Sequence, residues 1–362
     1  MLKPKQALRS LPAYHPPLAG RDGLRLDFNE NTVGCSPRVL DRMRRLDAED
    51  LARYPERQPA EEKAADFLGV AKSELLLTNG VDEAIHLICQ TYLEPGDQAL
   101  IVVPTYAMYR IYMMAAGAEL VSVPAGQGFQ FPSTDVRRAI TNRTRLIAIA
   151  NPNNPTGTIV STDELLQIAA CAPSAAVLVD EAYFEFCART ILPQRHERPN
   201  VFVARTFSKA YGLAGLRIGA LIGDPGQMSV LRRVSSPYNV NAVALACLPE
   251  ALNDQAYVQR YVSEILHSRA RLENALKTVG ISFWRSQANF VLIRVGSSPS
   301  DAKGFTERMR KRGVLVRDRS ADYGCEGCVR ITIGPREHTD QLLAALHETI
   351  GELGIARGVS LS

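Results

Sequence analysis

The 362-residue chain lacks both a long hydrophobic run and a surplus of one charge. No stretch approaches the roughly 18 apolar residues that a membrane-spanning helix needs, and residues 1–20 lack the unbroken apolar segment of a secretory signal peptide. The 42 Lys and Arg residues nearly balance the 38 Asp and Glu residues and are spread along the chain. We therefore predict neither a membrane protein nor a nucleic-acid-binding protein, because nucleic-acid binders usually gather their basic residues in one patch.

Motifs for metals and nucleotides are also scarce. The six histidines show no ligand spacing, and the CxxC at Cys325 and Cys328 has no second pair, so we interpret it as a loop and predict no metal. Neither GxGxxG nor a Walker lysine motif occurs, which leaves nucleotide binding without support. Seven cysteines without a secretory signal indicate reduced thiols and a cytoplasmic protein.

Short apolar runs alternate with helical patterns along much of the chain. Strands are predicted at residues 75–78, 99–103, 120–123, 146–150, 177–179, 201–204 and 218–222, and helices at 82–92, 106–116, 162–170 and 225–234. Strands this apolar are buried on both faces, which predicts an α/β large domain with a mainly parallel sheet covered by helices. Beyond residue 250 the pattern predicts a smaller α+β domain, with helices at 255–279 and 302–312, strands at 290–294, 314–317 and 329–333, and a final helix. We place the large domain at residues 36–250, the small domain at 251–362, and an N-terminal arm with part of the small domain at 1–35.

The most informative segment is RTFSKAYGLAGLRIG, at residues 205–219. Its lysine, Lys209, follows a predicted strand and Ser208, and it lies eight residues before Arg217. A hydroxyl and a guanidinium so placed can hold a phosphate beside the amine, and a partly desolvated amine readily forms a Schiff base with an aldehyde. The alternative is a solvated lysine among packing glycines, but other segments favour the same ligand.

Two of those segments follow apolar strands. Asp180, in VDEAY, ends one strand, and ligands of open α/β sheets bind outside the carboxyl ends of strands. Its carboxylate could keep a ring nitrogen protonated, as a pyridine-based electron sink requires, or it could simply cap a helix. Asn154, in the turn NPNNPTG, could donate to a phenolate-like oxygen or serve only the turn.

Two more segments suit a flat, phosphorylated ligand. Gly80, in TNGVDEA, lies where a strand passes into a helix, and glycine lets backbone amides approach a phosphate at that helix N-terminus. Tyr106 follows another strand in PTY and could stack on a flat ring.

Together these motifs resemble the fold type I pyridoxal-phosphate enzymes, specifically the class I and II aminotransferases. The similarity is closest to the histidinol-phosphate aminotransferase family, because NPNNPTG, VDEAYFEF and RTFSKAYGLAGLRIG match its signatures almost letter for letter. The resemblance covers nearly the whole chain. It implies pyridoxal 5′-phosphate as cofactor and a small-molecule amino donor and 2-oxo acid as substrates. The implied reaction converts histidinol phosphate and 2-oxoglutarate to imidazole acetol phosphate and glutamate, in histidine biosynthesis.

The resemblance also implies a set of cofactor contacts. Lys209 matches the lysine that binds the cofactor and moves protons, Asp180 the partner of the pyridine nitrogen, and Tyr106 the stacking aromatic. The further matches are Asn154 and Tyr183 at the cofactor's 3-oxygen, and Gly80, Val81, Asp82, Thr206, Ser208 and Arg217 at its phosphate. Tyr54 matches a tyrosine that reaches the phosphate of the neighbouring subunit, which implies a homodimer with shared active sites.

The implied substrate contacts are Tyr14, Asn29, Tyr238, Arg317 and Arg330. Arg330 matches the arginine that binds the substrate's anionic group, and Arg317 a second arginine at the substrate phosphate. A dianionic phosphate gains more from a second guanidinium fork than a carboxylate does. The alternative for Arg317 is a salt bridge with Asp318 or a surface position.

Other functions remain open from the sequence. An aromatic amino-acid aminotransferase is the nearest alternative, and a decarboxylase of the threonine-phosphate type shares the fold and the preference for phosphate. A cofactor-binding regulator is less favoured, because no DNA-binding segment is expected before the domain and the matched catalytic set is intact.

Overall fold

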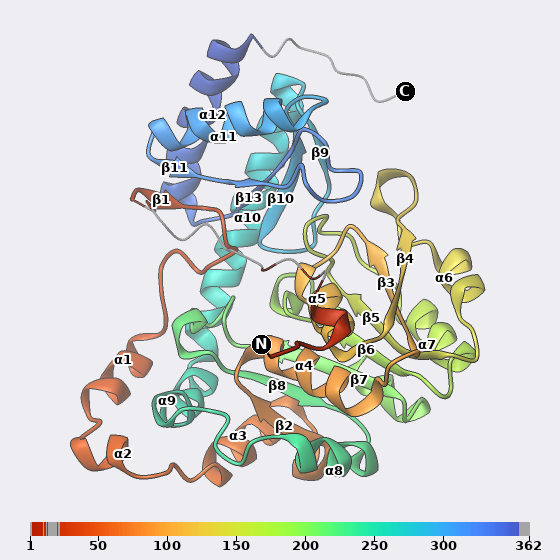
Figure 1. Ribbon diagram of the computed structural model, residues 1–362. Coiled ribbons are helices and arrows are strands. Elements are labelled where there is room, and N and C mark those ends of the chain that lie inside the picture. The colour runs from red at the N-terminus through yellow and green to blue at the C-terminus, as the bar shows by residue number, and fades with distance from the viewer. Residues whose placement is uncertain (1, 10, 12, 14–19, 21, 355–362) are drawn as a thin grey trace.

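A seven-stranded sheet forms the centre of the larger part of the molecule in the computed structural model, which describes residues 2–9, 11, 13, 20 and 22–354 (Figure 1). Its strand order is β2 (Leu75–Thr78), β8 (Gly219–Ile222), β7 (Val201–Thr206), β6 (Ala176–Asp180), β5 (Thr144–Ala150), β3 (Gln98–Val103) and β4 (Glu119–Pro124). Neighbours from β7 to β4 are parallel, whereas β8 is antiparallel to both β7 and β2. The predicted mainly parallel sheet is confirmed.

Helices cover both faces of this sheet because alternate strand residues point to opposite sides. Leu76, Ile101 and Leu178 pack with one group of helices, and Leu77, Ile147 and Val177 pack with the other. The first group is α4 (Gly80–Tyr92), α5 (Ala107–Ala116) and α8 (Pro225–Val234), and the second includes α3 (Gln58–Leu68), α6 (Ser133–Ala139), α7 (Thr162–Cys171) and α9 (Ala242–Asn253). Before α3 lie α1 (Pro37–Arg44) and α2 (Ala48–Ala52), which the sequence patterns did not predict.

A four-stranded antiparallel sheet forms the smaller part of the molecule, with the order β12 (Arg317–Asp318), β13 (Cys328–Thr332), β10 (Phe290–Arg294) and β9 (Ser282–Trp284). It packs with α10 (Gln255–Val279), α11 (Pro299–Lys311) and α12 (Arg336–Leu353). The α+β class predicted for this part is confirmed. Short 3-10 helices span Gln6–Leu8, Lys72–Glu74, Gln127–Phe129, Phe184–Phe186, Leu192–Glu197 and Ala214–Leu216.

The start of the chain joins this smaller part. Strand β1 (Leu24–Arg25) pairs in parallel with β11 (Val314–Leu315). After one intervening residue, Arg317 and Asp318 form β12, which pairs with β13. The run predicted as one strand at 314–317 is therefore two strands that serve two sheets. The domain limits at residues 36 and 250 stay a prediction, and α9 runs across the second of them.

The connection from β7 to β8 places the central motif of the sequence. Because β8 is antiparallel to β7, residues 207–218 turn back at the same sheet edge at which β5 and β6 end. Asn154, Asp180 and Lys209 are thereby brought to one edge, although they are far apart in sequence. Among the described helices, none is long and apolar enough to cross a membrane.

Candidate active site

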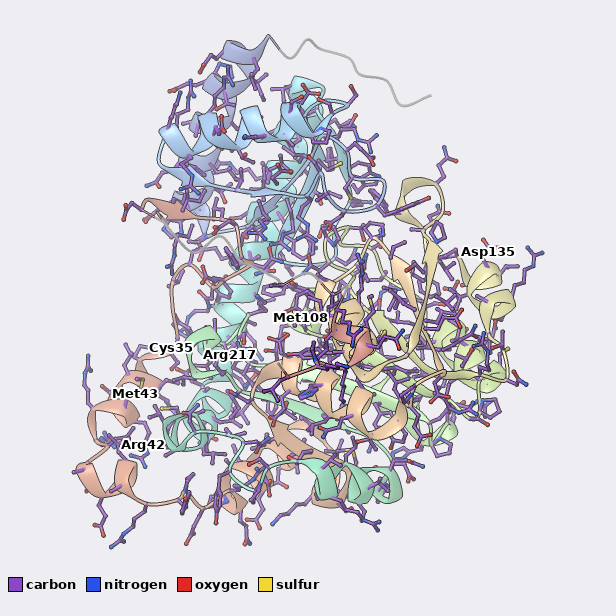
Figure 2. The ribbon with its side chains drawn as sticks, in the orientation of Figure 1. Cys35, Arg42, Met43, Met108, Asp135 and Arg217 are labelled. Atoms are coloured by element: carbon purple, nitrogen blue, oxygen red, sulfur yellow. The ribbon has the colours of Figure 1, made fainter. Side chains whose placement is uncertain are left out.

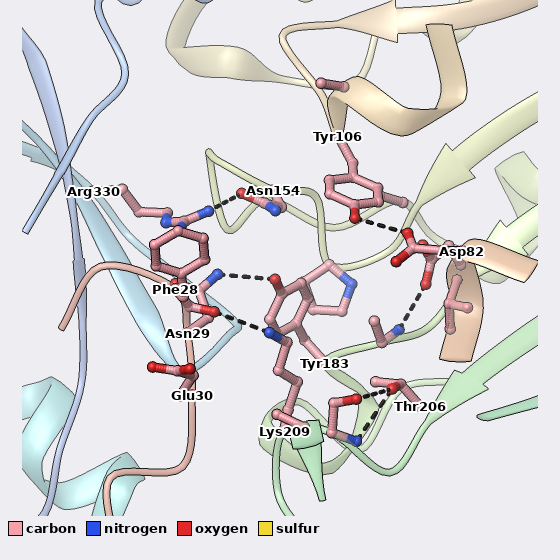
Figure 3. A pocket seen from close by; sticks show the side chains of 18 of the residues that line it. Phe28, Asn29, Glu30, Asp82, Tyr106, Asn154, Tyr183, Thr206, Lys209 and Arg330 are labelled. Carbon is pink, nitrogen blue, oxygen red and sulfur yellow. Dashed lines mark hydrogen bonds between the residues drawn. The ribbon is translucent and has the colours of Figure 1, made fainter. Parts of the chain in front are cut away.

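A cavity of about 300 Å³ lies at this sheet edge, between the carboxyl ends of the strands and the smaller part of the molecule (Figure 3). Most residues that the sequence predicted for the site line it: Asn29, Val81, Asp82, Tyr106, Asn154, Asp180, Tyr183, Thr206, Ser208, Lys209, Arg217, Arg317 and Arg330. The cavity therefore gathers side chains from the N-terminal segment, the large sheet and the β12–β13 hairpin.

Lys209 lies at the centre of the cavity. Its Nζ donates a hydrogen bond to the backbone oxygen of Phe28 at 3.0 Å. Burial, aided by the positive charge of Arg330, lowers the pKa of Lys209 to about 8. A lysine with this pKa is partly neutral near physiological pH, and a neutral amine can attack an aldehyde.

Asp180 lies at the floor of the cavity, at the end of β6. Its Oδ2 accepts a hydrogen bond from the Tyr109 hydroxyl at 2.6 Å, and its Oδ1 accepts one from the Ala182 amide at 3.0 Å. Burial raises the pKa of Asp180 to about 6, against the opposing effect of these two bonds. A buried carboxylate gains most from a cation, so Asp180 is suited to a protonated ring nitrogen.

The N-terminus of α4 forms one end of the cavity with groups that favour a phosphate. Gly80 begins α4 with φ +74°, and a Cβ there would lie 2.6 Å from Nη2 of Arg217. Only glycine leaves space for the guanidinium beside the helix N-terminus, where backbone amides attract anions. The hydroxyls of Thr206 and Ser208 lie 3.0 Å apart in the same part of the site.

Asp82 fixes two side chains at that end. Its Oδ1 accepts a hydrogen bond from the Tyr106 hydroxyl at 2.8 Å, and its Oδ2 lies 3.2 Å from Nη2 of Arg217. The Tyr106 ring borders the cavity, and burial with the nearby Asp82 raises the pKa of this tyrosine far above its usual value. Its hydroxyl thus stays protonated and anchored, which holds the ring in position for stacking.

The opposite side of the cavity holds two groups suited to a ligand oxygen. Asn29 donates from Nδ2 to the Tyr183 hydroxyl at 2.9 Å, so Tyr183 keeps its own proton to donate (Figure 3). Arg330 donates from Nη1 to Oδ1 of Asn154 at 2.5 Å, which leaves the Asn154 amide nitrogen as a donor. Arg330 also donates to the backbone oxygen of Asp27 at 2.7 Å.

Arg330 and Arg317 lie opposite each other on the paired strands β13 and β12, and both line the cavity. The Arg330 Nε is buried and has no hydrogen-bond partner within the described part of the chain. Burial, together with the neighbouring Arg319 and Arg317, lowers the pKa of Arg330 to about 10. The Arg317 guanidinium carbon lies 5.1 Å from the centre of the Phe28 ring. This end of the cavity therefore carries positive charge that suits an anion.

Tyr54 and Tyr238 do not line the cavity, and neither does Gly80, which begins α4 beside Val81 and Asp82. Tyr54 and Tyr238 stack on each other with ring centres 4.1 Å apart, and they are 77% and 53% exposed on the surface of the chain. Tyr14 lies outside the described residues. The predicted contributions of these tyrosines thus remain predictions.

Among the lining residues that sequence reasoning missed are Phe28, Tyr109 and Arg319. Tyr109 lies three residues after Tyr106 on α5, so helical spacing offered a signal for a second inward-facing ring. Arg319 lies two residues after Arg317, and strand alternation puts both on one face. Phe28 carried no signal of its own.

The residues present fit pyridoxal phosphate. A partly neutral lysine, a buried carboxylate, a ring-stacking tyrosine and a helix N-terminus beside Arg217 occur in one cavity, and the glycine at the phosphate end leaves the space that a Cβ would fill. Lys209 would hold the aldehyde carbon, Asp180 the ring nitrogen, and the Gly80–Arg217 end the phosphate.

Comparison with known proteins agrees with this geometry. Residues 21–346 match the family "Aminotransferase class I and II". The histidinol-phosphate aminotransferase of Geobacillus sp. (strain WCH70) is 34% identical over 96% of this chain and 98% of its own length, and that of Dehalococcoides mccartyi (strain CBDB1) is 34% identical over 91% and 90%. The crystal structure of histidinol-phosphate aminotransferase from Sinorhizobium meliloti with pyridoxal-5′-phosphate has a TM-score of 0.88 and 28% identity, covering 96% of this chain and 98% of the other. The chain belongs to the class I and II aminotransferase family and is a pyridoxal-phosphate-dependent aminotransferase.

Proposed function

We propose that this aminotransferase acts on histidinol phosphate and 2-oxoglutarate, forming imidazole acetol phosphate and glutamate in histidine biosynthesis. The observation that carries this proposal is the pair of arginines, Arg317 and Arg330, which lie opposite each other on β12 and β13 and line the cavity. Two guanidinium forks suit a dianionic phosphate. The names of the relatives support the same substrate.

The bound cofactor supplies an aldehyde and a ring that accepts electrons. We assign the transfer of the proton at the substrate's Cα to Lys209 Nζ, whose lowered pKa suits a general base near neutral pH. Asp180 would keep the ring nitrogen of the cofactor protonated, and Tyr106 would stack on the ring. Asn154 and Tyr183 would donate to the cofactor's 3-oxygen, and Asn29 orients Tyr183 through their hydrogen bond.

Arg317→Ala tests the substrate assignment. We expect kcat/KM for histidinol phosphate to fall roughly 30- to 150-fold, because a charge-assisted contact to a dianion is lost. This corresponds to about 2–3 kcal/mol of transition-state stabilisation. The loss for glutamate is expected to be much smaller, since Arg330 alone can hold one carboxylate. The measurement is the absorbance change of the cofactor in each half-reaction, at matched cofactor occupancy.

Arg310→Ala is the matched control, because Arg310 is an exposed arginine on α11 that does not line the active-site cavity. Equal losses for both substrates in Arg317→Ala would assign Arg317 to structure. If the wild-type enzyme converts an aromatic amino acid faster than histidinol phosphate, the aromatic alternative holds. Release of carbon dioxide without need for an oxo acid would favour the decarboxylase.

We also propose a cytoplasmic homodimer whose two active sites are shared. Tyr54 and Tyr238 form an exposed aromatic pair, and nearby helices carry exposed apolar side chains at Leu40, Met43 and Leu51. Figure 2 shows Met43 at the left edge of the molecule. Exposed apolar clusters of this kind mark protein–protein contacts. Seven free thiols fit a reducing compartment.

Mixing two inactive variants tests the shared site. With Tyr54 reaching the partner's cofactor phosphate, a heterodimer of Tyr54→Ala and Lys209→Ala holds one site with both defects and one with neither. We expect the mixture, after subunit exchange, to recover activity well above the sum of the two parents. The control mixture of Asp180→Ala with Lys209→Ala keeps one defect in every site and should recover none. No recovery in the first mixture would place Tyr54 outside the active site.

A further inference from the structure

The β12–β13 hairpin presents a third arginine to the active-site cavity. Arg317 pairs directly with Arg330, and the amide of Arg319 donates to the Cys328 oxygen at 3.0 Å, which continues the same register. Residues opposite each other, and residues two apart on a strand, point to one face of a sheet. The register thus puts Arg317, Arg319 and Arg330 on a common face, and all three line the cavity.

The loop that joins the two strands is held rigidly. It consists of successive turns, in which the Asp322 amide donates to Arg319 O at 2.9 Å, Cys325 to Asp322 O at 3.0 Å, and Cys328 to Cys325 O at 2.8 Å. Both cysteines are fully buried against Leu292. The buried CxxC segment therefore holds the loop in place and fixes the position of Arg319.

A carboxylate from the same loop adjusts the charge of this arginine cluster. Asp322 Oδ2 lies 2.5 Å from Nε of Arg319, and the two side chains are only 24% and 13% exposed. Three guanidiniums and one carboxylate sum to a net charge of +2. The other acids lining the cavity lie beside other groups, since Asp82 contacts Arg217, Asp180 accepts from Tyr109, and Glu30 lies 3.7 Å from Arg25.

Like charges in this cluster oppose one another until an anion enters. Arg319 and Arg317 both contribute to the lowered pKa of Arg330, whose main cause is burial. A phosphate monoester carries about −1.5 to −2 charges near pH 7. The charge of such a group matches that of the cluster, whereas a side-chain carboxylate neutralises only half of it.

We propose that Arg319 is a specificity-determining residue. Together with Asp322 it gives the substrate site a net positive charge that matches a phosphate dianion. This inference rests on the proposed function, because it concerns the phosphate of the same substrate. It assigns to Arg319 a direct contact with that phosphate, beside Arg317 and Arg330. Asp322 positions the Arg319 guanidinium and limits the charge of the site.

The experiment compares histidinol phosphate with histidinol, which differs only by the phosphate. The ratio of their kcat/KM values isolates the contribution of the phosphate from any general damage to the site. In Arg319→Gln we expect this ratio to fall roughly 10- to 100-fold, as for loss of a charged hydrogen bond. The value for histidinol itself should change less than about threefold, since histidinol has no phosphate to lose a contact. Arg319→Lys, which keeps the charge, should retain most of the ratio.

Asp322→Asn is the matched variant, which removes a negative charge where Arg319→Gln removes a positive one. The amide keeps an oxygen for Arg319 but raises the net charge, so the ratio should stay at the wild-type value or increase. An unchanged ratio in Arg319→Gln would overturn the role of Arg319. An equal fall of the ratio in Arg319→Gln and Asp322→Asn would overturn it too, because it would mean that only the structure of the loop matters. A wild-type ratio near one would instead reject the histidinol-phosphate assignment itself. Thermal unfolding midpoints within a few degrees of wild type establish that the variants are folded.

Discussion

Replacing Lys209 by alanine is expected to lower amino transfer by on the order of 10⁴-fold, because a positioned general base contributes up to about that factor and no other described amine lines the cavity. The variant loses both the group that binds the cofactor aldehyde and the group that moves the proton at Cα. It should still fold, since the hydrogen bond that Nζ makes within the described part of the chain, to the Phe28 oxygen, is the one lost. Single-turnover kinetics and the absorbance of protein-bound cofactor measure the two losses separately.

The pKa of about 8 adds a second readout to this prediction. Below that pH the amine is protonated and cannot attack, so uptake of cofactor by the wild-type apoprotein should accelerate as the pH rises from 7 to 8 and level off above. Lys72→Ala, at an exposed lysine outside the cavity, is the control and should behave as wild type. Normal turnover in Lys209→Ala would exclude the assigned role of this lysine.

Replacing Asp180 by asparagine is expected to slow removal of the Cα proton by roughly 150- to 5,000-fold. The protonated ring nitrogen would lose its buried counter-charge, and removing one partner of a buried ion pair costs about 3–5 kcal/mol. Asparagine keeps the shape of the side chain and an oxygen for the Tyr109 hydroxyl. Rapid mixing with substrate deuterated at Cα measures the effect, because proton removal then limits the rate and the isotope effect increases.

Tyr109→Phe provides a graded control for Asp180. It keeps the carboxylate but removes the 2.6 Å hydrogen bond that favours its charged form, so the pKa of Asp180 should rise above about 6. The loss of activity should be about tenfold or less at neutral pH and larger at acidic pH. An Asp180→Asn enzyme with unchanged single-turnover rates would show that this carboxylate serves only the structure.

Much of this enzyme could be predicted from its sequence because the informative patterns are local. The apolar runs predicted at 75–78, 146–150 and 177–179 placed strands within a residue or two of their observed bounds, since a strand buried on both faces has a continuous apolar run. The dense motifs around Asn154, Asp180 and Lys209 indicated the cofactor. Their chemistry depends on residue type and on position at a strand end, and both can be recognised in the amino-acid sequence.

Tertiary structure decided what depends on register and on contacts between distant segments. The run at 314–317 divides between two sheets because β11 meets β1 whereas β12 meets β13, and no local pattern encodes the choice of partner. Tyr109 reaches Asp180 across 71 positions, and Asn29 reaches Tyr183 across 154. Arg319 enters the cavity only because the hairpin register sets it beside Arg330 and the buried cysteines anchor its loop. Amino-acid types thus determined which chemistry the chain can perform, while strand pairing and burial determined which side chains surround the substrate, because only folding sets distances between residues far apart in the sequence.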